Sequence, residues 1–191
     1  TVHTYRVYQK GYAVLKIEKL RQRNAKHLGN VTREARIHLK VSSSSVLGPK
    51  RGLFGTQREF KGSDIAPVLY FSGVYGGHVI TCMEYIPGVP LQQYIANGTL
   101  TDTIVRRLER AVETLLRIGV VHGDLHANNI MVTSNERVVI LDYGFAFEIP
   151  PRVHDAVLKI LNSTKSIERA WIESGLQSVV NARFESIPYY H

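Results

Sequence analysis

Two aspartates and an asparagine, placed at the ends of short apolar strands where the chain must turn, constrain this fold more than any other feature. Asp124 and Asn129 lie close together in sequence, and Asp142 directly follows the apolar run Val138–Leu141. An unpaired carboxylate buried inside a protein costs several kcal/mol. We therefore expect both aspartates to face a cleft or a bound cation.

The residue types in this stretch favour a hard divalent cation. Carboxylates, an amide oxygen and water are the ligands that Mg²⁺ prefers. The chain has one cysteine, Cys82, and no cluster of His and Cys, which excludes an internal disulfide and argues against zinc. A lone Asp-x-Gly would indicate only a turn, but Asp142-x-Gly144 combined with Asp124 is far more specific.

The composition is that of a globular protein of modest size. The 191 residues suit one domain or two small lobes sharing a cleft, and 44% hydrophobic with 21% charged residues excludes wholesale disorder. No apolar run approaches the roughly 18 residues of a membrane helix, and Thr1–Thr4 does not begin a signal peptide. With a single cysteine we expect a reducing, cytoplasmic setting and no membrane partner. Because the first residue is not Met, we expect a further segment upstream.

The charge balance is basic, with 24 Lys and Arg against 16 Asp and Glu, a net charge of +8. A basic surface attracts polyanions such as nucleotides, nucleic acid or an acidic partner. An ordinary soluble surface fits equally well, and no RNA-binding signature is present. RNA or an RNA-associated complex therefore stays open as a partner.

Strand-forming residues gather in stretches bounded by turn residues. The expected strands are an N-terminal hairpin, a pair around a Gly-Gly turn and a buried run before the second aspartate: Thr1–Lys19, Pro67–Ser72, His78–Ile86 and Val138–Leu141. The stretch Ser42–Gly62 is polar, basic and rich in glycine, which predicts a loop.

Helical spacing of apolar residues is clearest over Thr101–Ile118, and Gly119 would end that helix. We expect a shorter helix at Asn30–Val41 and terminal helices from about His154 through Val180. This order of elements predicts an α+β chain of two unequal lobes.

Two motifs resemble those of the protein-kinase-like superfamily. The run His122-x-Asp124-x-x-x-x-Asn129 is similar to the catalytic loop. Asp142-Tyr143-Gly144 resembles the metal-binding DFG element, with Tyr in the Phe position.

Three further elements occur in the order that the resemblance requires. Ala13–Lys16 resembles the strand that carries the phosphate-binding lysine, Glu34 resembles the glutamate that pairs with it, and Met83–Ile86 resembles the hinge between kinase lobes. The resemblance spans roughly Thr1 to Phe147. It implies a two-lobed protein-kinase-like fold, with a small β-rich N-lobe at 1–86 and a reduced, mostly helical C-lobe at 87–191.

The resemblance implies a role for each polar residue of these motifs. Lys16 would contact the α- and β-phosphates of ATP while Glu34 holds its side chain. Asn129 and Asp142 would bind Mg²⁺ or Mn²⁺, and Asp124 would accept or orient the proton of the attacking hydroxyl. A solvated strand lysine and simple turn caps are the structural alternatives.

The same resemblance implies where adenine would lie. Backbone groups of Glu84 and Ile86 would bind its edge, and four apolar side chains, which ordinary core membership also explains, would sandwich its ring: Val14, Met83, Met131 and Leu141. His122 is expected to pack and hydrogen-bond, not to act as a base.

His126 stands two residues after Asp124, where conventional protein kinases carry lysine. Small-molecule kinases of the aminoglycoside and choline type often show His-Gly-Asp-Leu-His, as here. A neutral imidazole could donate a hydrogen bond to the transferring phosphate, or it could simply cap the loop.

The departures from the family pattern favour a small atypical kinase. Only Gly11 precedes Lys16, so a glycine-rich loop is expected upstream, and nothing like Ala-Pro-Glu follows Asp142. The chain thus resembles the RIO and KEOPS-associated kinases. The leading hypothesis is a minimal ATP-dependent serine/threonine protein kinase or kinase-like ATPase, with a protein substrate or regulatory partner. A small-molecule kinase and a nucleotide-binding adaptor with weak catalysis are the alternatives.

The run from Asp142 to Pro151 contains no Ser or Thr, and two prolines stiffen its exit. Control by phosphorylation of an activation loop is therefore not expected. A partner protein or the substrate would control the enzyme, unless it is constitutive.

Overall fold

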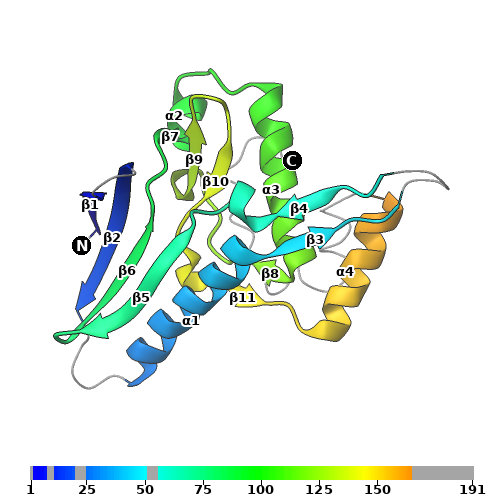
Figure 1. Ribbon diagram of the computed structural model, residues 1–191. Helices are drawn as coiled ribbons and strands as arrows, with labels where there is room; N and C mark the ends of the chain where they lie inside the picture. The colour runs from blue at the N-terminus through cyan, green and yellow to red at the C-terminus, as the bar shows by residue number, and fades with distance from the viewer. Residues whose placement is uncertain (1, 8–10, 20–24, 51–55, 165–191) are drawn as a thin grey trace.

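The computed structural model describes residues 2–7, 11–19, 25–50 and 56–164. Its first part is a four-stranded antiparallel sheet in the order β1-β2-β6-β5, with helix α1 packed beside β5 (Figure 1). In this sheet β2 lies between β1 and β6, which puts Lys16 opposite Thr81 on a central strand. The elements of this part are β1 (Val2–Val7), β2 (Gly11–Lys19), α1 (Ala25–Ser43), β5 (Leu69–Tyr75) and β6 (His78–Glu84).

The second part is built around the long helix α3, which contacts α4 and strand β10. Its short strands form two small antiparallel sheets, β10-β9-β7 and β11-β8. The elements are β7 (Gly88–Pro90), α2 (Leu91–Ala96), α3 (Asp102–Ile118), β8 (Val120–Val121), η2 (Ala127–Asn129), β9 (Ile130–Thr133), β10 (Val138–Ile140), η3 (Tyr143–Phe145), β11 (Phe147–Glu148) and α4 (Pro151–Thr164). The predicted α+β class with a β-rich N-terminal part is confirmed.

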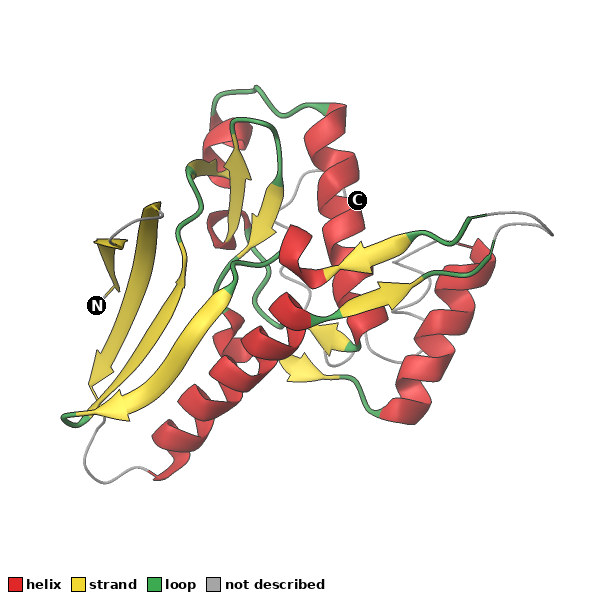
Figure 2. Cartoon of the chain, viewed as in Figure 1, coloured by secondary structure: helices red, strands yellow, loops and turns green. Residues whose placement is uncertain are grey.

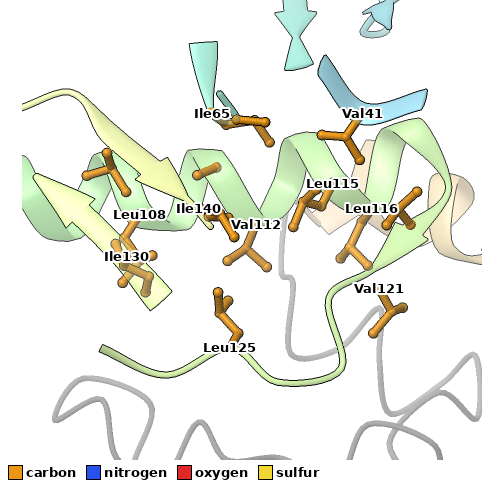
Figure 3. Packing of buried hydrophobic residues seen from close by; sticks show 14 of the residues in the cluster. Val41, Ile65, Leu108, Val112, Leu115, Leu116, Val121, Leu125, Ile130 and Ile140 are labelled. Atoms are coloured by element: carbon orange, nitrogen blue, oxygen red, sulfur yellow. The ribbon is translucent and has the colours of Figure 1, made fainter. Parts of the chain in front are cut away.

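Helix α3 forms where its sequence predicts, because both ends carry capping residues. The Thr101 hydroxyl accepts a hydrogen bond from the Ile104 N–H at 3.2 Å, and Gly119 ends the helix in the left-handed region at φ 84°. Burying one leucine of its apolar face contributes about 2 kcal/mol. This face forms the centre of the core, and Figure 3 shows its residues Leu108, Val112, Leu115 and Leu116.

One core joins the two parts of the molecule. Val41 of α1 and Ile65, which follows η1 (Gly62–Asp64), belong to the same buried cluster as α3, and Figure 3 shows them above that helix. The contact depends on Gly62, since a Cβ there would lie 1.6 Å from the Val41 carbonyl oxygen. A larger residue at 62 would force α1 away from η1.

The prediction of a loop over Ser42–Gly62 is wrong in part. Strands β3 (Ser45–Leu47) and β4 (Glu59–Lys61) pair antiparallel, with Val46 opposite Phe60, and both contact α3 (Figure 2). Phe60 is only 3% exposed, and the Arg117 guanidinium lies over its ring at 4.6 Å from the ring centre. Val46 and Phe60 are apolar residues in a polar stretch, and they pair across a long connection. The local sequence therefore has no periodicity that would predict these strands.

The other elements agree with the predictions in kind and differ in extent. The helix expected at Asn30–Val41 begins earlier, at Ala25, and the strand expected at Pro67–Ser72 runs over β5 instead. Helix α4 is described as far as Thr164, and the rest of the predicted terminal helices lies outside the described residues, as do two residues of the turn predicted at 9–11. Among the helices of the described ranges, none is long and apolar enough to cross a membrane.

Candidate active site

A cavity of about 320 Å³ lies among residues of β2, α1, β6, β9 and the turn after β10. All the predicted site residues except Asp124 and His126 line it: Val14, Lys16, Glu34, Met83, Glu84, Ile86, Asn129, Met131, Leu141 and Asp142. Residues far apart in sequence therefore meet in one place.

The polar end of the cavity holds a three-residue charge cluster. The Lys16 Nζ donates to Glu34 Oε1 at 2.7 Å and lies 3.5 Å from Asp142 Oδ1. Burial lowers the pKa of Lys16, but its hydrogen bond to Glu34 and the charges of Glu34, Asp142 and Glu18 outweigh this effect, so the pKa lies above its ordinary value. Lys16 is therefore a cation, held between two carboxylates at the cavity wall.

Asp142 sits in a turn that exposes its carboxylate. Its backbone is left-handed, with φ 59° and ψ 82°, and Oδ1 accepts a hydrogen bond from the Gly144 N–H at 3.3 Å. Aspartate tolerates this conformation better than most residues because its short side chain can bond locally, as here. With 54% of the side chain exposed, the carboxylate is free to take a cation.

Asn129 is fixed on the neighbouring loop. Its Nδ2 donates to the Asp124 carbonyl at 3.0 Å, so Oδ1 is the atom that can act as a ligand. Carboxylate and amide oxygens are the donor set of Mg²⁺ or Mn²⁺. Within the described ranges, no three or more His, Cys, Asp and Glu side chains are grouped so that they could hold a metal ion by themselves.

Asp124 and His126 lie on the loop beyond the cavity lining. Their side chains face each other, with His126 Nε2 3.7 Å from Asp124 Oδ2. Gly123, at φ 76°, lets this loop approach the turn after Asp142, since a Cβ there would lie 2.5 Å from the Phe145 carbonyl oxygen. The loop and the turn that carry the two aspartates are thus in contact.

A buried stack of aromatic rings contacts the loop and the turn that carry the two aspartates. Tyr143 is 1% exposed; His38 stacks on it at 5.1 Å, and His122 meets it edge-on at 5.3 Å. The His122 Nε2 bonds the Leu141 carbonyl at 2.8 Å, and its Nδ1 accepts from the Asp124 N–H at 3.4 Å. Burial lowers the pKa of His122, so the neutral ring positions both aspartates, in the packing role expected for it.

The apolar end of the cavity is formed by Val14 of β2, Met131 of β9 and Leu141. Beside them, the Glu84 N–H donates to the Val68 carbonyl at 2.8 Å, so this N–H is already used within the protein. The Glu84 carboxylate is 3.3 Å from the Arg137 guanidinium and accepts from the Val68 N–H.

Outside the predicted motifs, sequence reasoning missed three residues of the site. His38 and Pro67 line the cavity, and Arg33 donates from Nη2 to the Gly144 carbonyl at 3.2 Å. The position of His38, four residues after Glu34 on one helix face, could have indicated it. Nothing local indicates Arg33, because its partner lies 111 residues away.

The comparisons with known proteins agree with this geometry. The model of the ABC1 atypical kinase-like domain matches residues 71–173, more than half of the 191 residues. The chain belongs to this family. The ABC1 family is a branch of the protein-kinase-like superfamily, and the narrower resemblance to RIO and KEOPS-associated kinases is not supported.

Several curated proteins are similar to this ABC1 chain. Serine/threonine-protein kinase cds1 of Schizosaccharomyces pombe is 34% identical over 110 residues, 51% of this chain and 23% of that protein. ACTIVITY OF BC1 COMPLEX KINASE 7, chloroplastic, of Arabidopsis thaliana is 26% identical over 101 residues, 51% of this chain and 14% of that protein.

A probable serine/threonine-protein kinase, mkcE of Dictyostelium discoideum, is 31% identical over 71 residues, 35% of this chain and 10% of that protein. The chain therefore spans less than a quarter of the length of each of these relatives.

Proposed function

We propose that this chain binds ATP in the cavity and transfers its terminal phosphoryl group to a hydroxyl acceptor. One observation carries the proposal: the Lys16 ammonium is held by Glu34 and faces Asp142 at the polar end of an otherwise apolar cavity. Phosphoryl transfer needs mainly positioning and neutralisation of phosphate charge. The ABC1 family and the kinase names of the relatives support the same function.

In this proposal the apolar walls take the adenine ring, between Val14 on one side and Met131 and Leu141 on the other. The Glu84 carbonyl and the backbone of Ile86 bind the edge of the ring, while Lys16 binds the α- and β-phosphates. Glu34 keeps the lysine extended toward them, since its partner oxygen lies 2.7 Å away.

Asp142 and Asn129 would hold Mg²⁺ or Mn²⁺, which supplies positive charge to the phosphates when bound. Asp124 takes or orients the proton of the acceptor hydroxyl. Its loop is held for this task at two points, by the Asn129 side chain and by His122.

The leading acceptor is a serine or threonine hydroxyl of a protein, in line with the names of two relatives. A small-molecule acceptor is the second candidate, favoured by His126, whose imidazole lies 3.7 Å from Asp124 where a lysine would add charge. A nucleotide-binding adaptor is the third. The division into lobes at 1–86 and 87–191, a regulatory protein or RNA partner, and a cytoplasmic location remain proposals; the Arabidopsis relative is named as chloroplastic.

The test is a titration with ATP, with and without Mg²⁺ or Mn²⁺, followed by an assay of phosphate transfer. Labelled ATP is incubated with the chain alone, with generic protein and with a panel of hydroxylated metabolites. We expect cation-dependent binding that Lys16→Met weakens, and transfer that Lys16→Met and Asp124→Asn both reduce sharply. Binding without any transfer or hydrolysis would favour the adaptor, and absence of binding would refute the proposal.

A further inference from the structure

Helix α1 carries two cations that share one carboxylate. Arg36 Nη1 lies 2.7 Å from Glu148 Oε1, and Lys40 Nζ lies 2.6 Å from Glu148 Oε2. Arg36 and Lys40 are four residues apart, so they project from one face of the helix. Each oxygen of Glu148 therefore has its own cation.

Glu148 lies on β11, which is held by β8, the strand that precedes the loop carrying Asp124. Strand β11 pairs with β8, with Glu148 opposite Val120, and the Ile149 N–H donates to the Gly119 carbonyl at 2.8 Å. Strand β8 leads directly into His122 and the loop that carries Asp124. The two ion pairs thus fasten α1 to the part of the molecule that holds the catalytic loop.

The same helix has a second attachment one turn earlier. Arg33 donates to the Gly144 carbonyl, and its neighbour Glu34 pairs with Lys16. Because these residues belong to one helix, a movement of α1 away from β11 would also take Glu34 away from Lys16. The position of the lysine is therefore coupled to the charge on Glu148.

In kinases the lysine–glutamate pair must be formed for activity, and phosphorylation of the activation segment often controls it through new contacts with cations. Here the segment after Asp142 offers no Ser or Thr up to Pro151, and the cations of α1 already hold a carboxylate. The negative charge that phosphorylation would add is supplied here by the Glu148 side chain.

We propose that Glu148 is a positioning residue which, through Arg36 and Lys40, holds α1 in the place where Glu34 orders Lys16, so that a permanent carboxylate does the work of a switchable phosphate. This inference rests on the proposed function for its kinetic consequences. It predicts an enzyme whose competent state needs no modification of this segment.

The first test is kinetic. In Glu148→Gln the fraction of molecules with α1 in place falls, and the apparent affinity for ATP falls with it. We expect the KM for ATP to rise about three- to tenfold, in line with two partly exposed ion pairs, with a smaller change in kcat. KM should rise more steeply with ionic strength in the wild type than in the variant, because salt screens the Glu148 ion pairs in addition to the charged contacts of ATP that both proteins keep.

A charge exchange separates positioning from mere structural damage. Glu148→Lys alone should weaken ATP use more than Glu148→Gln, and adding Arg36→Glu and Lys40→Glu should recover most of the loss. The matched control is Glu59→Gln, which removes a carboxylate paired with Lys61 at 3.1 Å on β4, away from the site, and should change neither constant. An unchanged KM in Glu148→Gln, or no recovery in the triple variant, would overturn the inference.

A second measurement does not depend on turnover. Hydrogen exchange of the α1 amides should be faster in Glu148→Gln than in the wild type or in Glu59→Gln. If the wild type neither binds ATP nor transfers phosphate, the proposed function fails while the exchange result still decides the role of Glu148. Equal exchange of α1 in all three proteins would reject that role.

Discussion

The Leu141 N–H donates to the Asn129 carbonyl at 2.8 Å, which ties the residue before Asp142 to the loop that carries Asn129. This backbone bond extends the β9–β10 pairing, and together they bring the two candidate metal ligands to the same part of the cavity. Asn129 directly precedes strand β9, and Asp142 follows strand β10. The two segments have no other sequence feature in common.

Removal of the Asp142 carboxylate should abolish the benefit of the divalent cation. Asp142→Ala leaves phosphate charge uncompensated, so we expect kcat/KM to fall by about 10²- to 10³-fold, the range for loss of one strong electrostatic contact. Asn129→Ala should cost less, because a water can replace an amide oxygen. Calorimetry with ATP, with and without Mg²⁺, checks this; equal affinity in both conditions for the wild type would contradict the assignment.

Lys16→Met should weaken productive ATP binding, and Glu34→Ala should reproduce part of the loss. Glu34→Ala also leaves the half-buried Lys16 with weaker partners, so the free energy of unfolding should drop by about 1 to 3 kcal/mol. ATP titration and urea unfolding of both variants measure the two effects. Unaltered kinetics in Glu34→Ala would disprove the pair's role.

Asp124→Asn should reduce phosphate transfer by about 10²- to 10⁴-fold, the usual contribution of a general base. ATP affinity should stay within a few fold, since Asp124 does not line the cavity. Single-turnover transfer and equilibrium binding separate the two quantities. Near-normal turnover in this variant would remove Asp124 from the mechanism.

The site could be predicted from sequence because its residues lie in short motifs with fixed order. The order from Lys16 to Asp142 was enough to propose one cavity, and the structure brings all but two of those residues to its lining. The contacts of α1 could not be predicted, since Arg33, Arg36 and Lys40 look like an ordinary charged helix face. Only the fold reveals that their partners lie more than a hundred residues away.

The elements of the fold also differ in how well they could be predicted, depending on whether their sequence signal is local or comes from distant residues. Helix α3 was predictable because its caps and its apolar spacing are contiguous. The β3–β4 pair was not, because Val46 and Phe60 lie far apart in the sequence and both strands also pack against α3. Burial of Phe60 beneath Arg117 is a property of the assembled core, with no counterpart in the local sequence.

Tyr143→Phe should stabilise the protein. The Tyr143 hydroxyl is buried and makes no hydrogen bond within the described residues. A buried hydroxyl without a partner costs about 1 to 3 kcal/mol, while a phenyl ring keeps the stacking on His38 and His122. We expect a gain of about 1 kcal/mol and a rise in Tm of about 2 to 4 °C. Tyr143→Leu, which removes the ring as well, is the control and should lower Tm; a loss of stability in Tyr143→Phe would mean that the hydroxyl has a partner.

The two histidines beside Tyr143 should make stability depend on pH. Burial lowers the pKa of His38 and of His122 below the ordinary value. Each ring donates a hydrogen bond to a carbonyl, that of Pro67 for His38 and that of Leu141 for His122; these bonds raise the pKa, but burial lowers it by more. In the unfolded chain both imidazoles take up a proton near pH 6.5.

Below about pH 6.5 the unfolded state therefore binds more protons than the folded state, and acidification favours unfolding. We expect the free energy of unfolding to fall by up to about 1.4 kcal/mol per pH unit for each histidine as the pH drops from 6.5 toward the folded pKa values. Above pH 7.5 this contribution should be constant.

Urea unfolding at pH 5.5, 6.5 and 7.5 measures the slope for the wild type, His38→Gln, His122→Gln and the double variant. Each single variant should lose part of the slope between pH 5.5 and 6.5 and the double variant most of it, whatever its absolute stability. A double variant that keeps the wild-type slope would show that the stack around Tyr143 does not carry the pH dependence.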